Sequence, residues 1–240
     1  LGDVYKRQDV HHAPTLQQLV HGQDAVINLV AILHGSESAF EQTHVQLPAK
    51  LAHACASENV RRLVQVSALG ADVQGPSRYQ RSKGRGEQVL LAAAQRDHLA
   101  LTMLRPSVIF GKDDQFINLF AKLQRVFPFM PLAGARTRFQ PVWVQDVAQA
   151  IVHALTHSET AGHTYELCGP EVFTLRELVE LAGRWIHRSR PVVPLPHSIG
   201  WAQAWMMEHM PGPTLMSRDN LASMQVDNVA TGRVPGLRSL

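Results

Sequence analysis

A nearly unbroken apolar run at residues 25–33 constrains the fold of this chain most strongly. It is rich in β-branched side chains and has Asn28 as its one polar member. A strand that is apolar at almost every position is typical of a parallel sheet that helices cover on both faces. The run therefore predicts a strand buried on both faces in an α/β fold.

Segments with helical and strand character alternate along the first half of the chain. Helical spacing precedes the apolar run, at residues 15–20, and a helix follows at 44–57 with Pro48 in its first turn. A second strand at 62–67, a helix from Tyr79 to about Gln95 and a third strand at 99–104 complete the pattern. This order predicts a parallel sheet with right-handed crossovers, whose ligands bind at the carboxyl ends of the strands.

The second half of the chain is less regular and predicts a smaller α/β region. Asp146 is interpreted as a helix cap rather than a catalyst, and Thr174 with Glu177 forms a capping box that opens a further helix. The remaining expected elements are helices at 114–127, 147–157, 198–210 and 218–224 and extended pieces at 138–144 and 163–167. We expect residues 1–8 to be a non-native scar, 9–157 to be the nucleotide-binding domain and 158–240 to complete the substrate side.

Composition excludes several classes of protein. A hydrophobic fraction of 45%, a charged fraction of 18% and a net charge of +3 with scattered Lys and Arg are typical of a globular protein that does not bind nucleic acid. No apolar run reaches the ~20 residues of a membrane span, so no transmembrane segment is expected. Cys55 and Cys168 lie in apolar segments and predict two free thiols in a reducing compartment, which favours the cytoplasm. We expect no metal site, because His34 and His44, near the predicted cofactor edge, belong to no metal-ligand set.

The stretch from Ser77 to Lys83 contains a Tyr-x-x-x-Lys pair. Tyr79 and Lys83 are four residues apart, so their side chains share one face of a helix. A neighbouring ammonium favours the phenolate, which would let Tyr79 exchange a proton with a substrate oxygen. The same spacing also occurs in helices where a partly exposed Tyr lies near a solvated Lys. The spacing alone therefore does not identify a catalytic pair, and the surrounding residues must be considered.

These stretches together resemble the extended or atypical short-chain dehydrogenase/reductase superfamily, which includes NAD-dependent epimerases and dehydratases. The resemblance implies a Rossmann-like, doubly wound parallel sheet. From about Asp9 to its C-terminus the chain is most similar to the nucleotide-binding accessory subunit of respiratory complex I and its bacterial relatives, whereas sugar-nucleotide epimerases resemble its second half less. The matching segments are residues 24–31, 63–67, 77–83, 104–111, 116–120, 140–148, 217–219 and 234–237.

The resemblance assigns expected roles to particular residues. It implies that Tyr79 transfers the substrate proton, that Lys83 lowers the pKa of Tyr79 and holds the nicotinamide ribose, and that Ser67 orients the substrate oxygen. Ser67 can equally be a strand-end hydroxyl that caps a loop. The cofactor-binding residues that the resemblance implies are Asp9, Val10, Asn28, Leu29, Val30, Ala31, Val66, Ser67, Tyr79, Lys83, Arg105, Pro106, Ser107 and Val108.

The glycine-rich turn that cradles a dinucleotide pyrophosphate is missing from this sequence. Such a turn belongs before Asp9, yet Gly2 is the only glycine before Gly22. We therefore expect the first βαβ unit to be missing, an apolar sheet edge to be exposed, and the chain to bind dinucleotide weakly. The residues that choose NAD or NADP would be missing too; the resemblance slightly favours NADPH.

Three functions remain open from the sequence. The first is an NAD(P)-binding protein of the complex I accessory type, with a structural or redox-sensing cofactor, a respiratory-complex partner and a place at the periphery of the inner membrane. The second is an active NAD(P)-dependent oxidoreductase or nucleotide-sugar epimerase/dehydratase that uses Tyr79 and Lys83. The third is a non-catalytic scaffold that binds a protein partner.

Overall fold

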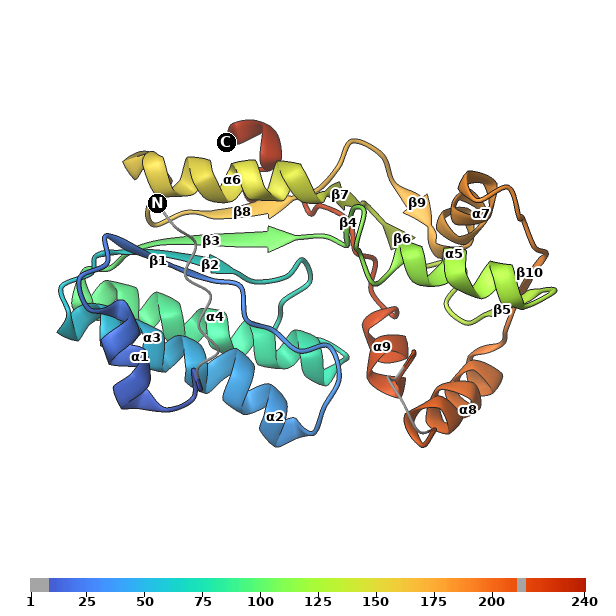
Figure 1. The fold of residues 1–240 in the computed structure, drawn as a ribbon, viewed down its shortest axis with the longest axis horizontal. Coiled ribbons are helices and arrows are strands. Elements are labelled where there is room, and N and C mark those ends of the chain that lie inside the picture. The colour runs from blue at the N-terminus through green and yellow to red at the C-terminus, as the bar shows by residue number, and fades with distance from the viewer. Residues whose placement is uncertain (1–8, 211–214) are drawn as a thin grey trace.

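The computed structural model describes residues 9–210 and 215–240 (Figure 1). Residues 1–8, interpreted above as a non-native scar, lie outside the described part. Within it, four parallel strands form the main sheet in the order β1-β2-β3-β8. These strands are β1 (Ala25–Asn28), β2 (Arg62–Val66), β3 (Ala100–Pro106) and β8 (Thr164–Leu167). The predicted parallel sheet of an α/β fold is confirmed.

Helices cover both faces of the main sheet (Figure 1). On one face lie α1 (Ala13–Val20), α3 (Leu47–Ser57) and α4 (Arg78–Asp97), and on the other lies α6 (Val144–Thr156). Successive side chains of a strand point to opposite faces. Leu63 of β2 accordingly belongs to the core beneath α3 and α4, whereas its neighbour Val64 packs with Val147 and Ala150 of α6. Because the strands direct apolar side chains to both faces of the sheet, helices pack against both faces, and this is the doubly wound arrangement.

A smaller region of short strands and helices lies beyond the carboxyl ends of β2 and β3. The expected capping box is present, with Thr174 opening α7 and Glu177 bonding back to it. Asp146 lies in the first turn of α6 but does not cap it. The elements of this region are β4 (Ile109–Phe110), α5 (Ile117–Val126), β5 (Met130–Leu132), β6 (Arg138–Phe139), β7 (Val142–Trp143), β9 (Phe173–Thr174), α7 (Leu175–Trp185), β10 (Val192–Pro194), α8 (His197–Glu208) and α9 (Arg218–Ser223).

Segments from both sides of residue 157 contribute to both regions. β8 follows that position and lies in the main sheet, while α5 precedes it and packs with α7 in the smaller region. Two short 3-10 helices are η2 (Ser158–Thr160), directly after α6, and η3 (Leu237–Ser239), near the end of the chain. The domain division at residue 157 stays a prediction.

Both cysteines are free. Among the described residues, no helix combines the length and apolar character needed to cross a bilayer.

The apolar run at 25–33 forms a shorter and less buried strand than predicted. Asn28 ends β1 because its side-chain oxygen accepts from the Val30 amide at 3.1 Å, which turns the chain. Its amide group donates to Gln65 on β2 at 2.8 Å. β1 also stands at one end of the strand order, and Leu29 just beyond it is 62% exposed. The expectation of burial on both faces is therefore wrong, and the apolar edge is exposed as expected.

The helix predicted at 44–57 begins earlier and contains a π-helical turn. Ser36 caps α2 (Glu37–Glu41), which runs through the π-helix η1 (Gln42–Gln46) into α3. Pro48 therefore lies inside a continuous helical segment rather than in its first turn. Proline has no N–H with which to pair the carbonyl four residues earlier, that of His44. That carbonyl instead faces Gly86 of α4, where a Cβ would lie only 1.9 Å from the oxygen.

This contact predicts that Gly86→Ala destabilises the chain. In an isolated helix the change would stabilise by about 0.5–1 kcal/mol, because alanine restricts the unfolded chain. Here the methyl group would collide with backbone, so we expect a net loss of about 1–3 kcal/mol in the free energy of unfolding. Urea denaturation followed by circular dichroism measures the loss.

Gly236→Ala is the matched control for this test. Its φ is −99° and the nearest heavy atom to an added Cβ is 3.7 Å away. We expect it to leave the free energy of unfolding nearly unchanged. Equal stability of the two variants would show that α4 and the π-helical turn are not in the close contact described.

Candidate cofactor site

A cavity of about 1070 Å³ opens at the carboxyl ends of β2 and β3, between the main sheet and the smaller region. This is the edge at which parallel α/β sheets bind their ligands. The sequence-predicted site residues that line it are Leu29, Ala31, Val66, Ser67, Tyr79, Lys83, Pro106, Ser107 and Val108. Most of the predicted site residues therefore share one cavity, although their roles stay predictions.

The N-terminus of α4 is held from two directions, and this places Tyr79 on the cavity wall. Ser77 and Gln80 form a capping box at its first turn. From α9, the Asp219 carboxylate accepts from the backbone amides of Arg78 at 2.7 Å and Tyr79 at 3.1 Å. A carboxylate at this end of a helix satisfies unpaired N–H groups and complements the helix dipole. The sequence alone did not assign this role to Asp219.

Lys83 lies one turn further along α4 and is almost fully buried. Its side chain is 4% exposed, and its Nζ donates to the Val66 carbonyl at the end of β2, at 3.1 Å. Burial lowers the pKa of Lys83 to about 8, and the carboxylate of Glu87 opposes part of that shift. The ammonium group is therefore charged at neutral pH but loses its proton far more readily than an exposed lysine.

Tyr79 does not have the lowered pKa that the Tyr-Lys pair predicts. Burial raises the pKa of Tyr79 to about 12. Its ring packs edge-on against His44 at 5.4 Å between centroids and against Phe40 at 6.4 Å. The expected lowering of this pKa by Lys83 is not found in this structure, because burial of the phenol raises the pKa.

Ser67 and Gln203 are cavity-lining residues that each have a buried polar atom without a hydrogen-bond partner among the described residues. Ser67 follows β2 directly, and its backbone amide donates to the Leu104 carbonyl at 2.7 Å. The residue is 6% exposed, and among the described residues its hydroxyl finds no hydrogen-bond partner. An unpaired buried hydroxyl costs about 1–3 kcal/mol. A ligand with hydroxyl groups would remove this cost, and the role of Ser67 stays a prediction.

His44 links the loop after β1 to α4. Its Nε2 accepts from the Ile32 amide at 3.1 Å, so the proton of the neutral ring is on Nδ1, which donates to Ser82 Oγ at 2.8 Å. Ser82 in turn donates to the Tyr79 carbonyl at 2.9 Å. Burial, aided by the charge of Lys83, lowers the pKa of His44 to about 3. The ring is neutral and serves to position residues 29–33. The π-helical turn carries His44, and Pro48 inside the helix is the sequence signal for that turn.

Several predicted residues point away from the cavity. Arg105 forms a two-pronged ion pair with Glu87 of α4, and this pairing raises the pKa of Arg105. Asn28 is occupied with Gln65 and Val30, as described above. Val30 lines a separate void of about 10 Å³ beside Lys83, close to the size of one water molecule.

Asp9 and Val10 lie away from the cavity in this structure. The Asp9 carboxylate accepts from the His11 amide at 2.9 Å, and Val10 packs against the core formed by α1, α3 and α4. Neither lines the cavity. Their predicted contact with the adenine edge stays a prediction.

Asn228, which was not anticipated from the sequence, occupies the end of β3. Its Oδ1 accepts from Ser107 Oγ at 2.6 Å and from the Val108 amide at 3.2 Å, and its Nδ2 donates to the Leu69 carbonyl at 3.2 Å. The resemblance assigns the main chain of residues 105–108 to a nicotinamide carboxamide. A side-chain carboxamide already binds the Val108 amide here, so that group is free for a ligand only when Asn228 turns away.

Comparisons with solved structures identify the same architecture. A dTDP-glucose 4,6-dehydratase from Streptomyces venezuelae superposes with a TM-score of 0.71 at 21% identity, covering 90% of this chain and 76% of that one. A UDP-glucose 4-epimerase from Thermotoga maritima superposes with a TM-score of 0.68 at 14% identity, covering 92% and 82%. At these identities the likeness establishes the fold alone.

Sequence comparisons are more specific. A mitochondrial NADH dehydrogenase [ubiquinone] 1 alpha subcomplex subunit 9 from Arabidopsis thaliana is 32% identical over 96% of this chain. The mouse protein of the same name is 29% identical over 97%. This chain spans 60% and 61% of the length of these two relatives. Residues 5–168 match the model of the NAD dependent epimerase/dehydratase family, and the chain belongs to that family.

Proposed function

We propose that this chain is a nicotinamide-dinucleotide-binding protein of the complex I accessory-subunit type, in which the cofactor has a structural or redox-sensing role. The observation that supports this most directly is the pairing of a buried, unpartnered hydroxyl with a buried ammonium at one cavity. Ser67 and Lys83 together offer a hydroxyl group and a charged donor where two strands end. That combination suits the adjacent hydroxyl groups of a ribose.

The remaining cavity residues have complementary tasks in this proposal. Lys83 and Ser67 would bind the nicotinamide ribose, and the backbone at Leu29 to Ala31 would pass beneath the dinucleotide. Pro106, Ser107 and Val108 would line the nicotinamide end. The bound cofactor supplies the capacity to carry a hydride. We take NADP as the preferred form, following the resemblance found in the sequence.

A structural role is proposed over turnover because of Tyr79. A phenol whose pKa is about 12 transfers its proton poorly near pH 7, where an efficient acid-base group has a pKa close to the operating pH. The sequence relatives that cover nearly all of this chain are named as subunits of a respiratory enzyme. Both facts support a cofactor that is held rather than turned over.

An active NAD(P)-dependent oxidoreductase or epimerase/dehydratase is the second candidate. It is supported by the shared cavity of Ser67, Tyr79 and Lys83, which is the residue set that the family resemblance assigns to catalysis. Tyr79→Phe separates the two candidates when turnover of NADPH with carbonyl substrates is assayed beside cofactor binding. Lost turnover with retained binding would establish an enzyme, whereas absence of turnover in both forms supports the proposed binding role.

A protein partner is part of the proposal. Exposed apolar side chains gather on α8, among them Trp201, Trp205 and Met206. We propose that the chain binds through this surface to a respiratory complex at the periphery of the inner membrane. Co-migration of the native protein with the respiratory NADH dehydrogenase on a native gel supports this, and migration as a free chain in every fraction contradicts it.

Dinucleotide affinity tests the proposed role of Lys83. We expect NADPH and NADH to bind this chain with Lys83 Nζ as one ligand of the ribose. Lys83→Met, which removes the ammonium but keeps the volume, should weaken binding about tenfold, the loss of one charge-assisted hydrogen bond. Titration followed by the fluorescence of the reduced nicotinamide measures both.

Lys122→Met is the matched control for this titration. Lys122 is exposed on α5 and lies outside the cavity lining. Its replacement should leave the Kd unchanged. Equal losses in the two variants would mean that the dinucleotide binds by general attraction to positive charge. No effect of Lys83→Met on clear binding would place the cofactor elsewhere.

The pKa of Lys83 makes this affinity depend on pH. Burial depresses the folded pKa from 10.5 to about 8, so the ammonium that donates to the ribose is fully present below that value and is lost above it. Affinity for NADH should therefore fall by up to about tenfold as pH rises from about 7 to about 9. The Lys83→Met variant should show a flat profile, and a wild-type profile that is equally flat would exclude the ammonium as a ligand of the dinucleotide.

A further inference from the structure

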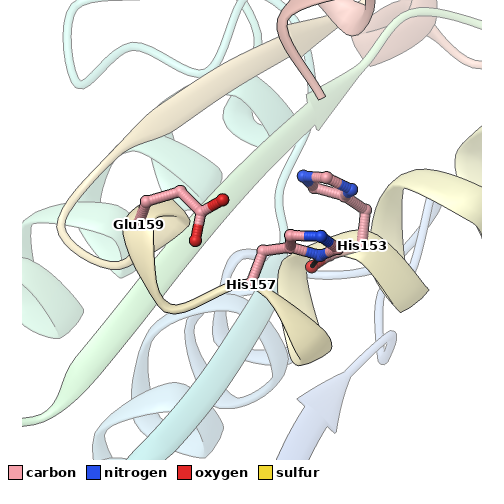
Figure 2. Close-up of side chains that lie close together, drawn as sticks. All are labelled: His153, His157 and Glu159. Carbon is pink, nitrogen blue, oxygen red and sulfur yellow. Dashed lines mark hydrogen bonds between the residues drawn. The ribbon is translucent and has the colours of Figure 1, made fainter.

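We propose that His153, His157 and Glu159 form a binding site for a divalent cation of the zinc class. Figure 2 shows the three side chains at the end of α6, with the Glu159 carboxylate directed toward the two rings. Their candidate ligand atoms all lie within 4.8 Å of one another, and no other such group of three occurs in the described part of the chain. Two imidazoles and a carboxylate are ligands that zinc accepts in proteins.

The two histidines are spaced to share one ion. They are four residues apart, with His153 in the last turn of α6 and His157 directly after it, and their rings stack at 3.7 Å between centroids. A tetrahedral ion with Zn–N bonds of ~2.0–2.1 Å needs its ligand atoms about 3.3 Å apart. The ligand atoms therefore need to converge, and rotation of the His153 and Glu159 side chains toward Nε2 of His157 achieves this without moving the helix.

The hydrogen bonds of His157 leave the correct nitrogen free. Its Nδ1 lies 3.2 Å from the His153 carbonyl oxygen and 2.9 Å from Thr156 Oγ1. A carbonyl only accepts, and the Thr156 hydroxyl donates to the Val152 carbonyl at 3.0 Å, so Nδ1 carries the proton of the neutral ring. The lone pair is then on Nε2. Metal-binding histidines are commonly fixed in this way by a carbonyl on the other nitrogen.

The backbone that carries the three ligands is held firmly. Arg62, at the start of β2, donates to the Ala154 carbonyl at 3.1 Å and to Thr160 Oγ1 at 2.8 Å. The Thr160 hydroxyl itself donates to the His157 carbonyl at 2.7 Å. These bonds fix the short helix η2, and with it Glu159, against the end of α6. The backbone frame of the site is thus rigid, and His157 is held in place by the hydrogen bonds on its Nδ1.

Charge also favours a cation at this place. The C-terminal end of a helix has a partial negative charge, and the ligands lie in and just after the last turn of α6. Among the described residues, the Glu159 carboxylate makes no ion pair with Lys or Arg. Three protein ligands leave a fourth position of a tetrahedral ion open to water or to a partner's side chain. The site lies at the amino-terminal edge of the sheet, opposite the cavity, and is independent of the proposed cofactor.

Titration of the chain with ZnCl₂ in competition with a chromophoric chelator tests this site. We expect one ion per chain, with His153→Ala and His157→Ala each weakening the affinity at least about tenfold, the loss of one ligand. Glu159→Gln should weaken it less, because the amide oxygen keeps its position but loses its charge. Co²⁺ in place of Zn²⁺ should give the visible absorption of a tetrahedral ion, absent from the two histidine variants.

His197→Ala, an exposed histidine at the start of α8, is the matched control and should bind as the wild type does. Binding that survives in the His153→Ala/His157→Ala double variant would overturn the proposal. Loss of binding on replacement of His11 and His12 instead would overturn it as well, as would the absence of saturable binding. Circular dichroism of each variant separates loss of the site from loss of the fold.

Discussion

Burial of the Lys83 ammonium at the end of β2 is the constraint on which the rest of the cavity depends. A buried charge is stable only with partners, and here these are the Val66 carbonyl and the carboxylate of Glu87. Glu87 is in turn neutralised by Arg105 from β3. The pairing explains why Arg105 points into α4 instead of into the cavity. Burial keeps the adjacent His44 neutral by lowering its pKa, and the charge of Lys83 adds to this effect.

The position of that ammonium depends on the packing of α4. The π-helical turn before Pro48 brings the His44 carbonyl against Gly86, so the two helices approach closely beside Lys83. The same turn directs the His44 ring toward Ile32 and Ser82, which ties the loop after β1 to the helix that carries Tyr79. The same π-helical turn therefore sets both the close packing of the helices and the geometry of the polar groups.

The smaller region completes the site by reaching back to the sheet. Asp219 of α9 holds the first turn of α4, and Asn228 joins Leu69 to Val108. Because both contacts connect residues more than a hundred positions apart, a change in the smaller region can alter the cavity without touching a residue of the sheet. These contacts physically couple the smaller region to the cavity.

Local patterns in the sequence predicted the elements that depend on local chemistry. Alternating helical and β-branched segments identified the parallel sheet, and the Thr174 and Glu177 capping box located the start of α7. The same patterns placed Ser67, Tyr79 and Lys83 at one edge, because strand ends meet there. They could not show that Asn28 would end β1 early, since the decisive contact is a side chain bonding its own backbone. They could not reveal the pairing of Arg105, the role of Asn228 or the raised pKa of Tyr79, because those depend on tertiary neighbours and burial.

The most direct test of this account is a crystal structure of the chain soaked with NADPH at millimolar concentration. The account predicts density for a ribose in the cavity, with its hydroxyl groups within hydrogen-bonding distance of Lys83 Nζ and Ser67 Oγ. A dinucleotide bound at any other surface, with both of these groups untouched, would contradict it.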